Sequence, residues 1–67
     1  MRITRIIEKT PTIDSAGKWS IYCQVLRGVT YQYGVIVCDT KEEAFAIKEG
    51  QIIDTEKFSF EHRTKNV

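Results

Sequence analysis

Hydrophobic and polar residues alternate in two neighbouring stretches of the chain, residues 19–26 and 29–38, with Gly28 just before the second. A period of two is typical of a half-buried β-strand, and a glycine between two such runs is a turn signal. The more apolar set comprises Trp19, Ile21, Cys23, Val25, Val29, Tyr31, Tyr33, Val35 and Val37. The pattern therefore predicts an antiparallel hairpin with one apolar face.

The register of this hairpin depends on the length of its loop. A two-residue loop, Arg27-Gly28, would pair Leu26 with Val29 and mix the apolar set of one strand with the polar set of the other. A three-residue loop that also includes Leu26 pairs Val25 with Val29 instead. Gly28 then takes the left-handed position of a type I turn followed by a bulge. We predict this second register, because a slip by one residue would expose the apolar face.

Segments on either side of the hairpin complete the predicted fold. Residues 2–9 form a predicted strand, and two consecutive isoleucines in it break the alternation, which indicates a kink or an edge position. Residues 14–18 are rich in turn formers. A last strand is predicted over residues 58–63, and residues 64–67 are predicted to be a frayed tail.

A short helix is predicted over residues 40–49. Thr40 and Glu43 have the spacing of a capping box, and acidic residues in the first turn suit the helix dipole. Gly50 is a signal for the end of the helix. Because so short a helix is marginal alone, packing must hold it in place.

The predicted order of elements is strand, strand, strand, helix, strand. It predicts an α+β fold with a small antiparallel sheet of roughly three to four strands (β-β-β-α-β) and one short helix. The helix, together with Phe58 and Phe60, is expected to cover the apolar face of the hairpin. A small SH3-like or OB-like β-barrel, in which the helix is only a corner, is the competing architecture.

Length and composition limit the class of protein. The 67 residues leave room for one domain, residues 1–67, and 42% hydrophobic content is ordinary for a globular chain. No apolar run approaches the roughly 20 residues that span a bilayer, and the N-terminal residues lack the apolar block of a signal peptide, so we expect a cytoplasmic protein with no membrane partner. A net charge of +1 argues against a dedicated nucleic-acid binder.

The sequence contains no set of side chains with catalytic spacing. The single histidine, His62, matches no nucleophile signature, and the glycines are not spaced as a phosphate loop. Cys23 and Cys38 match no zinc spacing, and the predicted register puts them on opposite faces, where they cannot form a disulfide. We expect no enzyme, no cofactor and no metal. Cys38 is the one candidate for thiol chemistry, because it precedes a predicted helix N-terminus; a packed strand-end residue is the alternative.

The second face of the predicted hairpin is our candidate partner surface. It is more apolar than a solvated sheet requires, so we interpret it as a surface for another protein, with the N-terminal strand as the alternative cover. Its residues are Tyr22, Gln24, Leu26, Gln32 and Ile36. Pairing of the edge strand, residues 2–9, with a second copy of the chain is a further possible contact.

Basic residues near the termini form the alternative candidate site. They would gather at one edge if the first and last strands are neighbours, and would then make a weak nucleic-acid-binding patch. Their other interpretation is edge charge that prevents strand-to-strand aggregation. These residues are Arg2, Arg5, Arg27, Arg63 and Lys65.

The chain from Lys18 onward carries a recognisable order of features: a tryptophan-led hairpin, a Thr-x-x-Glu-Ala helix start at residues 40–44, and one more strand. This order resembles small phage-encoded inhibitors of bacterial RNA polymerase. It is also similar to the three-strand-plus-helix DNA-binding domains of phage integrases and plant AP2 factors. The compact fold, the lack of a catalytic set and the spare second face predict a non-enzymatic protein-binding module, and the resemblance implies a phage or mobile-element accessory protein that modulates a host protein. No binding residue is carried over from these families.

Overall fold

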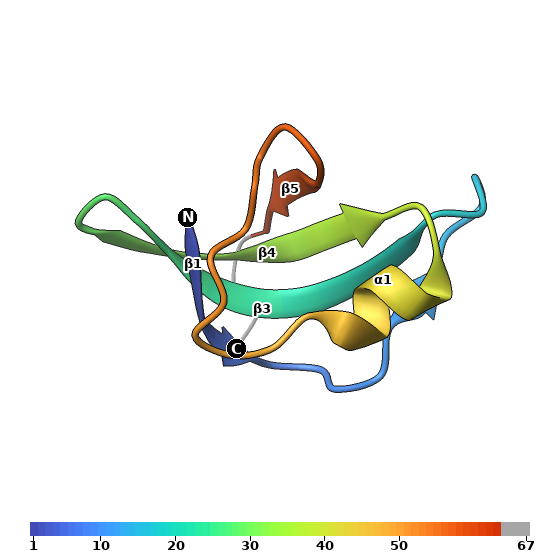
Figure 1. Cartoon of the computed structure of the whole chain (residues 1–67), viewed down its shortest axis with the longest axis horizontal. Helices are drawn as coiled ribbons and strands as arrows, with labels where there is room; N and C mark the ends of the chain where they lie inside the picture. Colours follow the sequence, from blue (N-terminus) through green and yellow to red (C-terminus); the bar gives the residue numbers. More distant parts are fainter. Residues whose placement is uncertain (64–67) are drawn as a thin grey trace.

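Two nine-residue strands, β3 (Trp19–Arg27) and β4 (Thr30–Cys38), form the centre of the molecule. The computed structural model describes residues 1–63, and in it these two strands pair antiparallel along their whole length (Figure 1). β1 (Arg2–Ile6) pairs with the other side of β3, and β5 (Ser59–His62) pairs with the other side of β4. The sheet order is therefore β1-β3-β4-β5.

A short helix, α1 (Lys41–Ala46), and a two-residue strand, β2 (Thr12–Ile13), which also pairs with β3, complete the fold. The predicted α+β class is confirmed as a five-stranded antiparallel sheet with one short helix, although the sequence did not predict β2. The sheet is open, with β1 and β5 as its end strands, so the alternative of a closed barrel is not formed. The predicted tail, residues 64–67, lies outside the described residues.

The predicted register of the hairpin is wrong. Arg27 pairs with Thr30, so the loop consists of Gly28 and Val29 and not of a three-residue turn with a bulge. Gly28 has a φ of 62°, and Val29 does not have a positive φ. A positive φ at the first loop residue only is the pattern of a type II′ turn, whose twist matches that of the flanking strands. The observed pairing differs from the prediction by an odd number of residues, so β4 presents its other face to the core.

The core lies on one side of the sheet. Ile21, Cys23 and Val25 of β3 share this side with Ile36 and Cys38 of β4, and all are nearly inaccessible. Four further buried residues join them from β1, α1 and the chain after the helix: Ile3, Ala44, Ile47 and Ile53. Trp19, Phe58 and Phe60 pack against this cluster, so the helix and the last strand cover the hairpin as expected.

A bulge interrupts β1 at Thr4. Ile3 pairs with Val25 and Arg5 pairs with Gln24, so Thr4 is the extra residue. The hydroxyl of Thr4 donates to the backbone carbonyl of Gln24 at 3.1 Å. Because a bulge changes the alternation by one position, the strand can direct isoleucines on both sides of it to the core. The strand predicted over residues 2–9 thus has its irregularity at Thr4 and not at the two consecutive isoleucines, ends at Ile6, and lies at the end of the sheet.

The outer edge of β1 is covered by the chain that follows the helix. The Ile3 N–H donates to the Gln51 carbonyl at 2.9 Å, and the Ile3 carbonyl accepts from the Gly50 N–H at 2.7 Å. The Met1 carbonyl accepts from the Ile53 N–H at 2.7 Å. These bonds occupy backbone groups of Met1 and Ile3 that an added strand would need.

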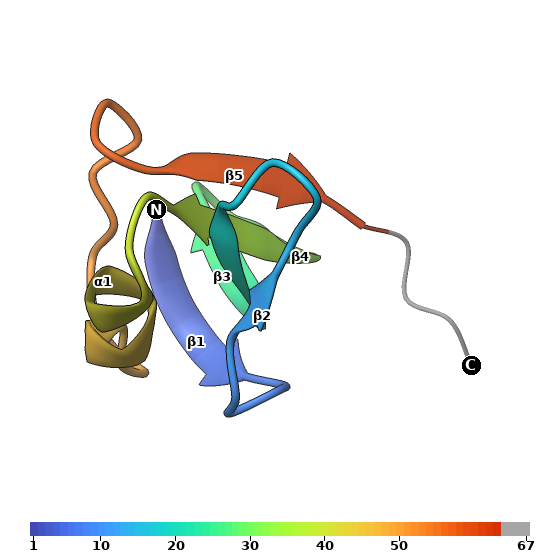
Figure 2. The same ribbon diagram turned by 90° about the vertical axis from the view of Figure 1, so that its right-hand side faces the viewer.

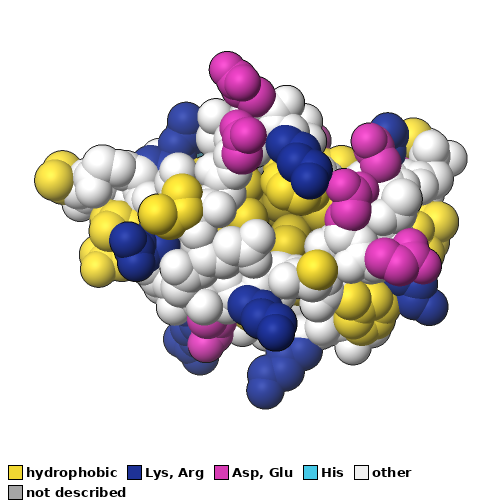
Figure 3. Space-filling model, in the orientation of Figure 1, with side chains coloured by type: hydrophobic (Ala, Val, Ile, Leu, Met, Phe, Trp, Pro, Cys, Tyr) yellow, Lys and Arg dark blue, Asp and Glu magenta, His cyan; other side chains and the backbone are white. Residues whose placement is uncertain are grey.

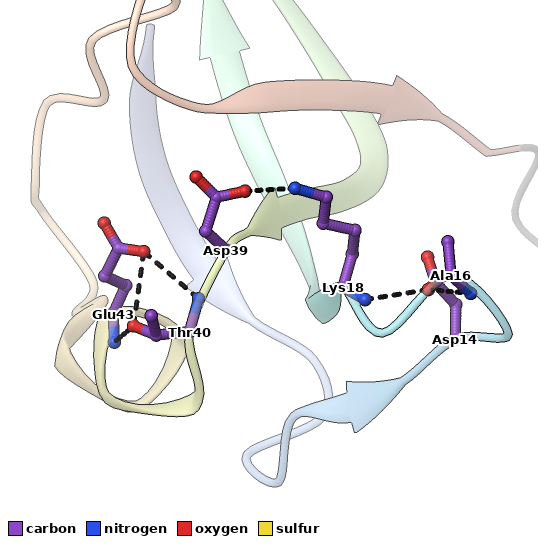
Figure 4. Close-up of polar contacts among 6 residues, drawn as sticks. All are labelled: Asp14, Ala16, Lys18, Asp39, Thr40 and Glu43. Atoms are coloured by element: carbon purple, nitrogen blue, oxygen red, sulfur yellow. Dashed lines mark hydrogen bonds and ion pairs between the residues drawn. The ribbon is translucent and has the colours of Figure 1, made fainter.

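The capping box is confirmed at the start of α1. The Thr40 hydroxyl accepts from the Glu43 N–H, and the Glu43 carboxylate accepts from the Thr40 N–H, both at 3.2 Å (Figure 4). The helix nevertheless ends at Ala46, earlier than predicted. Ile47 is already extended and only 4% exposed, because the chain must leave the helix there to bury it. Gly50, with a φ of 85°, belongs to a later turn.

Gly34 of β4 provides the space in which β5 packs. A Cβ at this position would lie 2.4 Å from the Glu61 carbonyl and 2.5 Å from the Phe60 ring. Phe60 pairs with Ile36, so its ring lies on the core side of the sheet. The absence of a side chain at Gly34 therefore allows β5 to approach β4 closely.

The predicted turn before β3 is confirmed. The Asp14 carboxylate accepts from the backbone N–H groups of Ala16 and Lys18, both at 2.9 Å. The Lys18 ammonium donates to the carboxylate of Asp39, which precedes α1 (Figure 4). This hydrogen bond, with the charge of Asp39, raises the pKa of Lys18 above its ordinary value. The contact links the start of β3 to the end of β4.

Candidate functional site

The side of the sheet opposite the core is the candidate functional site. Within residues 1–63, α1 packs on the core side, as do Ile47 and Ile53 after it (Figure 2). Alternation along β3 and β4 then fixes the residues of the other side. We call this set the open face: Ser20, Tyr22, Gln24 and Leu26 of β3, with Tyr31, Tyr33, Val35 and Val37 of β4.

The open face is aromatic at its centre. The ring centroids of Tyr22 and Tyr33 are 6.4 Å apart, with the ring planes tilted by 39°. Such a separation and tilt are within the range of favourable aromatic pairs. Tyr31, paired with Leu26 near the hairpin turn, is 61% exposed. The remaining members of the face are half-buried by their neighbours.

The bulge in β1 adds two arginines to this face. Arg2 pairs with Leu26, and Arg5 pairs with Gln24. In a regular strand, residues three apart point to opposite sides. Here the extra residue, Thr4, brings both arginines to the side of the open face while Ile3 points to the core.

A third arginine, Arg63, borders the open face just after the end of β5. Glu61 pairs with Val35, and the Arg63 guanidinium lies 3.8 Å from the Glu61 carboxylate. The Arg63 N–H donates to the Tyr33 carbonyl at 2.8 Å, which continues the ladder beyond β5. Arg5 and Arg63 therefore lie at opposite margins of a row that crosses the sheet through Gln24 and Tyr33.

Three of the five residues predicted for the partner surface lie on the open face, and two lie on the core side. Tyr22, Gln24 and Leu26 lie on the open face. Gln32 pairs with Val25 on the core side, and Ile36 is 0% exposed in the core. Both errors follow from the wrong hairpin register, which assigned the wrong face of β4 to the core.

The same error hid half of the open face. Tyr31, Tyr33, Val35 and Val37 were assigned to the core because they form the more apolar set of β4. The signal that could have corrected the assignment is Gly34, since a glycine in the other set leaves room for a side chain from a neighbouring strand.

The basic residues predicted to form one patch are separated. Arg2, Arg5 and Arg63 border the open face, whereas Arg27 lies beside the hairpin turn and is exposed. Lys65 lies outside the described residues. The first and last strands are not neighbours: they form the two opposite ends of the sheet.

The cysteines do not have the properties of reactive thiols. Both lie on the core side, which corrects the prediction of opposite faces, and both are free. They are four residue positions apart along the strand pair, roughly 13 Å. Burial raises the pKa of Cys38 from 9.0 to about 11, with further contributions from Glu43 and Asp39. The expected effect of a helix N-terminus is thus outweighed.

Within residues 1–63, no group of three or more His, Cys, Asp and Glu side chains is arranged to hold a metal ion. No helix in the same range is long and apolar enough to cross a membrane. Comparison of the chain with protein-family models, with curated proteins and with solved structures finds no match. The resemblance to phage polymerase inhibitors and to integrase-type domains therefore stays a prediction.

Proposed function

We propose that this protein is a non-enzymatic binding module that binds another protein through the open face of its sheet. The observation that carries the proposal is the group of aromatic and aliphatic side chains around the Tyr22–Tyr33 pair, on the side of the sheet away from the helix. An apolar patch of this kind on a small domain is typical of a surface that another molecule covers.

The composition of the open face suits a protein partner. Protein interfaces are enriched in tyrosine and arginine and depleted in lysine and acidic residues, and tyrosine and arginine dominate their binding energy. The open face and its margins hold three tyrosines and three arginines, with Glu61 as the acidic residue paired onto it. Nucleobases stack on aromatic rings and gain little from aliphatic side chains. Leu26 and Val35 therefore favour a protein partner, whose apolar side chains can pack against them.

The charge at the margins indicates what the partner carries around its contact patch. Arg2 and Arg5 make the β1 margin positive, whereas Arg63 at the far margin lies 3.8 Å from the Glu61 carboxylate, so that margin carries both signs. A complementary partner has an apolar centre with acidic side chains opposite the β1 margin. For a phage or mobile-element accessory protein, as the resemblance implies, such a partner is a host protein.

A pull-down from bacterial lysate tests the proposal. The tagged chain, its Tyr22→Ala variant and a Phe45→Ala control are compared after nuclease treatment; Phe45 is an exposed aromatic of α1, outside the open face. We expect one stoichiometric protein, retained by the wild type and the control and lost by Tyr22→Ala. Retention by Tyr22→Ala, or equal loss by both variants, contradicts the proposal.

Nucleic-acid binding is the second candidate function. It is favoured by one specific observation: the bulge puts Arg2 and Arg5 on the same face as the tyrosine pair. Aromatic rings beside arginines can bind single strands by stacking and phosphate contacts. This candidate predicts recovery that disappears with nuclease, binding that weakens steeply with salt, and a further loss in Arg63→Ala.

A further inference from the structure

A pocket of about 350 Å³ lies on the core side of the sheet, between β1 and the helical region. Pockets for small molecules usually have roughly 300–1,000 Å³. Ile6, Ile21 and Ile47 line it, and Phe45 of α1 forms an exposed part of its wall. Ile21 and Ile47 are only 3% and 4% exposed, so they form a fixed apolar floor.

Two lysines stand at the margin of this pocket. Lys9 comes from the chain after β1, and Lys48 comes from the chain after α1. Both are exposed, and neither forms an ion pair with another described residue. Figure 3 views the same side of the molecule and shows basic side chains gathered along its lower edge.

The acidic residue at the pocket already has a structural role. The Glu49 carboxylate accepts a hydrogen bond from the Ile6 N–H at 2.9 Å. That contact satisfies an outward-facing backbone group of β1, an edge strand that would otherwise be open to pairing. Glu49 keeps its negative charge, but neither Lys9 nor Lys48 forms an ion pair with it, so both ammonium groups are available for the charge of a ligand.

We propose that this pocket binds a small amphiphilic carboxylate, with its apolar chain on Ile6, Ile21 and Ile47 and its carboxylate between Lys9 and Lys48. The apolar floor can bury an alkyl chain, and the two ammonium groups, which come from different segments, can bind an anionic head group. A neutral apolar molecule leaves both ammonium groups unused, and inorganic phosphate leaves the floor unused. The site is separate from the open face, so it does not depend on the proposed function.

Titration with decanoate, followed by the NMR shifts of the isoleucine methyl groups, tests this proposal. We expect saturable shifts at Ile6, Ile21 and Ile47, and much weaker binding of decanol and of inorganic phosphate. Decanol binding as tightly as decanoate overturns the proposal, because the lysines then contribute nothing. Shifts restricted to residues outside the pocket, or no saturable shifts, also overturn it.

Charge variants at the pocket are expected to change the affinity for decanoate in opposite directions. Lys48→Gln is expected to weaken decanoate binding roughly two- to fivefold, the range for exposed charge pairs. Glu49→Gln keeps an acceptor for the Ile6 N–H and removes a negative charge, so it is expected to tighten binding by a similar factor. Lys57→Gln, in the turn before β5, is the matched control and leaves the affinity unchanged. Equal effects of Lys48→Gln and Lys57→Gln contradict a local site.

A membrane surface is the other source of an anionic amphiphile, and a separate arm distinguishes it. The chain is mixed with vesicles that contain phosphatidylglycerol and is then sedimented. We expect the wild-type protein to sediment with the vesicles no more than the Lys48→Gln variant does. We also expect the wild type to bind free decanoate saturably. Sedimentation with vesicles, without saturable decanoate binding, overturns the proposal of a small-molecule pocket.

Discussion

Tyr22 of β3 and Tyr33 of β4 lie diagonally across the strand pair, with their ring centroids 6.4 Å apart and their planes tilted by 39°. Tyr22 pairs with Val35, and Tyr33 pairs with Gln24, so each tyrosine lies two residues along its strand from the partner of the other. Diagonal neighbours on one face are within reach of aromatic side chains. The two rings thus define the centre of the proposed interface.

Replacing Gly34 with alanine should loosen the last strand. The new methyl group would lie 2.4 Å from the Glu61 carbonyl and 2.5 Å from the Phe60 ring, so β5 must move away from β4. We expect a loss of about 2 kcal/mol in the free energy of unfolding, as for other overpacked sites. Urea denaturation measures the loss, and hydrogen exchange of the β5 amides locates it.

Gly17→Ala is the control for this experiment. Gly17 also has no side chain, and a Cβ there would meet nothing within 4 Å, but its φ of 80° makes alanine unfavourable for the backbone alone. It should lower stability without a selective loss of protection in β5. Protection in β5 that survives Gly34→Ala would contradict our account of how the strand is held.

Thr40→Ala should destabilise the protein by about 1 kcal/mol through loss of the helix cap. The Thr40 hydroxyl accepts the Glu43 N–H, and alanine cannot replace it. Thr40→Ser keeps the hydroxyl and should lose only a small part of this energy. The check is thermal unfolding of the three proteins; equal midpoints for the alanine and serine variants would show that the cap contributes little.

Local chemistry could be predicted from the sequence more successfully than strand register. The cap at Thr40 and the turn at Asp14 depend on side chains bonding to backbone groups a few residues away, and both predictions are confirmed. The end of the helix could not be predicted in the same way. It depends on burying Ile47 and on docking Gly50 against β1, which are distant contacts.

The candidate surface was only partly predictable for the same reason. Both sets of side chains in β4 contain apolar residues, so hydrophobicity alone favoured the set with Tyr33 and Val35 for the core. The structure selects the set with Ile36, because Gly28 begins a two-residue turn and Gly34 admits the Phe60 ring. The local pattern did not reveal that contact, because β5 is distant in the sequence.

Stability should fall at high pH because of the cysteines. Burial raises the pKa of Cys23 from 9.0 to about 11, and that of Cys38 to about 11. Between these values the unfolded chain loses thiol protons that the folded chain keeps. The contribution is therefore complete below pH 9 and is lost as the pH rises towards 11.

Denaturant unfolding at a series of pH values checks this expectation. The wild type is compared with Cys23→Ala and Cys38→Ala, since tyrosine and lysine side chains also titrate in alkaline solution. Each variant should show a shallower loss of stability with pH than the wild type, whatever its stability at neutral pH. Identical slopes in all three proteins would mean that the thiols titrate alike in the folded and unfolded chains.

The most direct test of the account is to map the interface on the protein itself. An isotope-labelled chain is titrated with the purified partner from the pull-down, and the backbone amide shifts are followed by NMR. We predict that the largest changes fall on Tyr22, Tyr33 and Val35, while Phe45 and Ile47 on the helix side stay unchanged. Changes centred on the helix side, with the open face unaffected, would contradict the central claim.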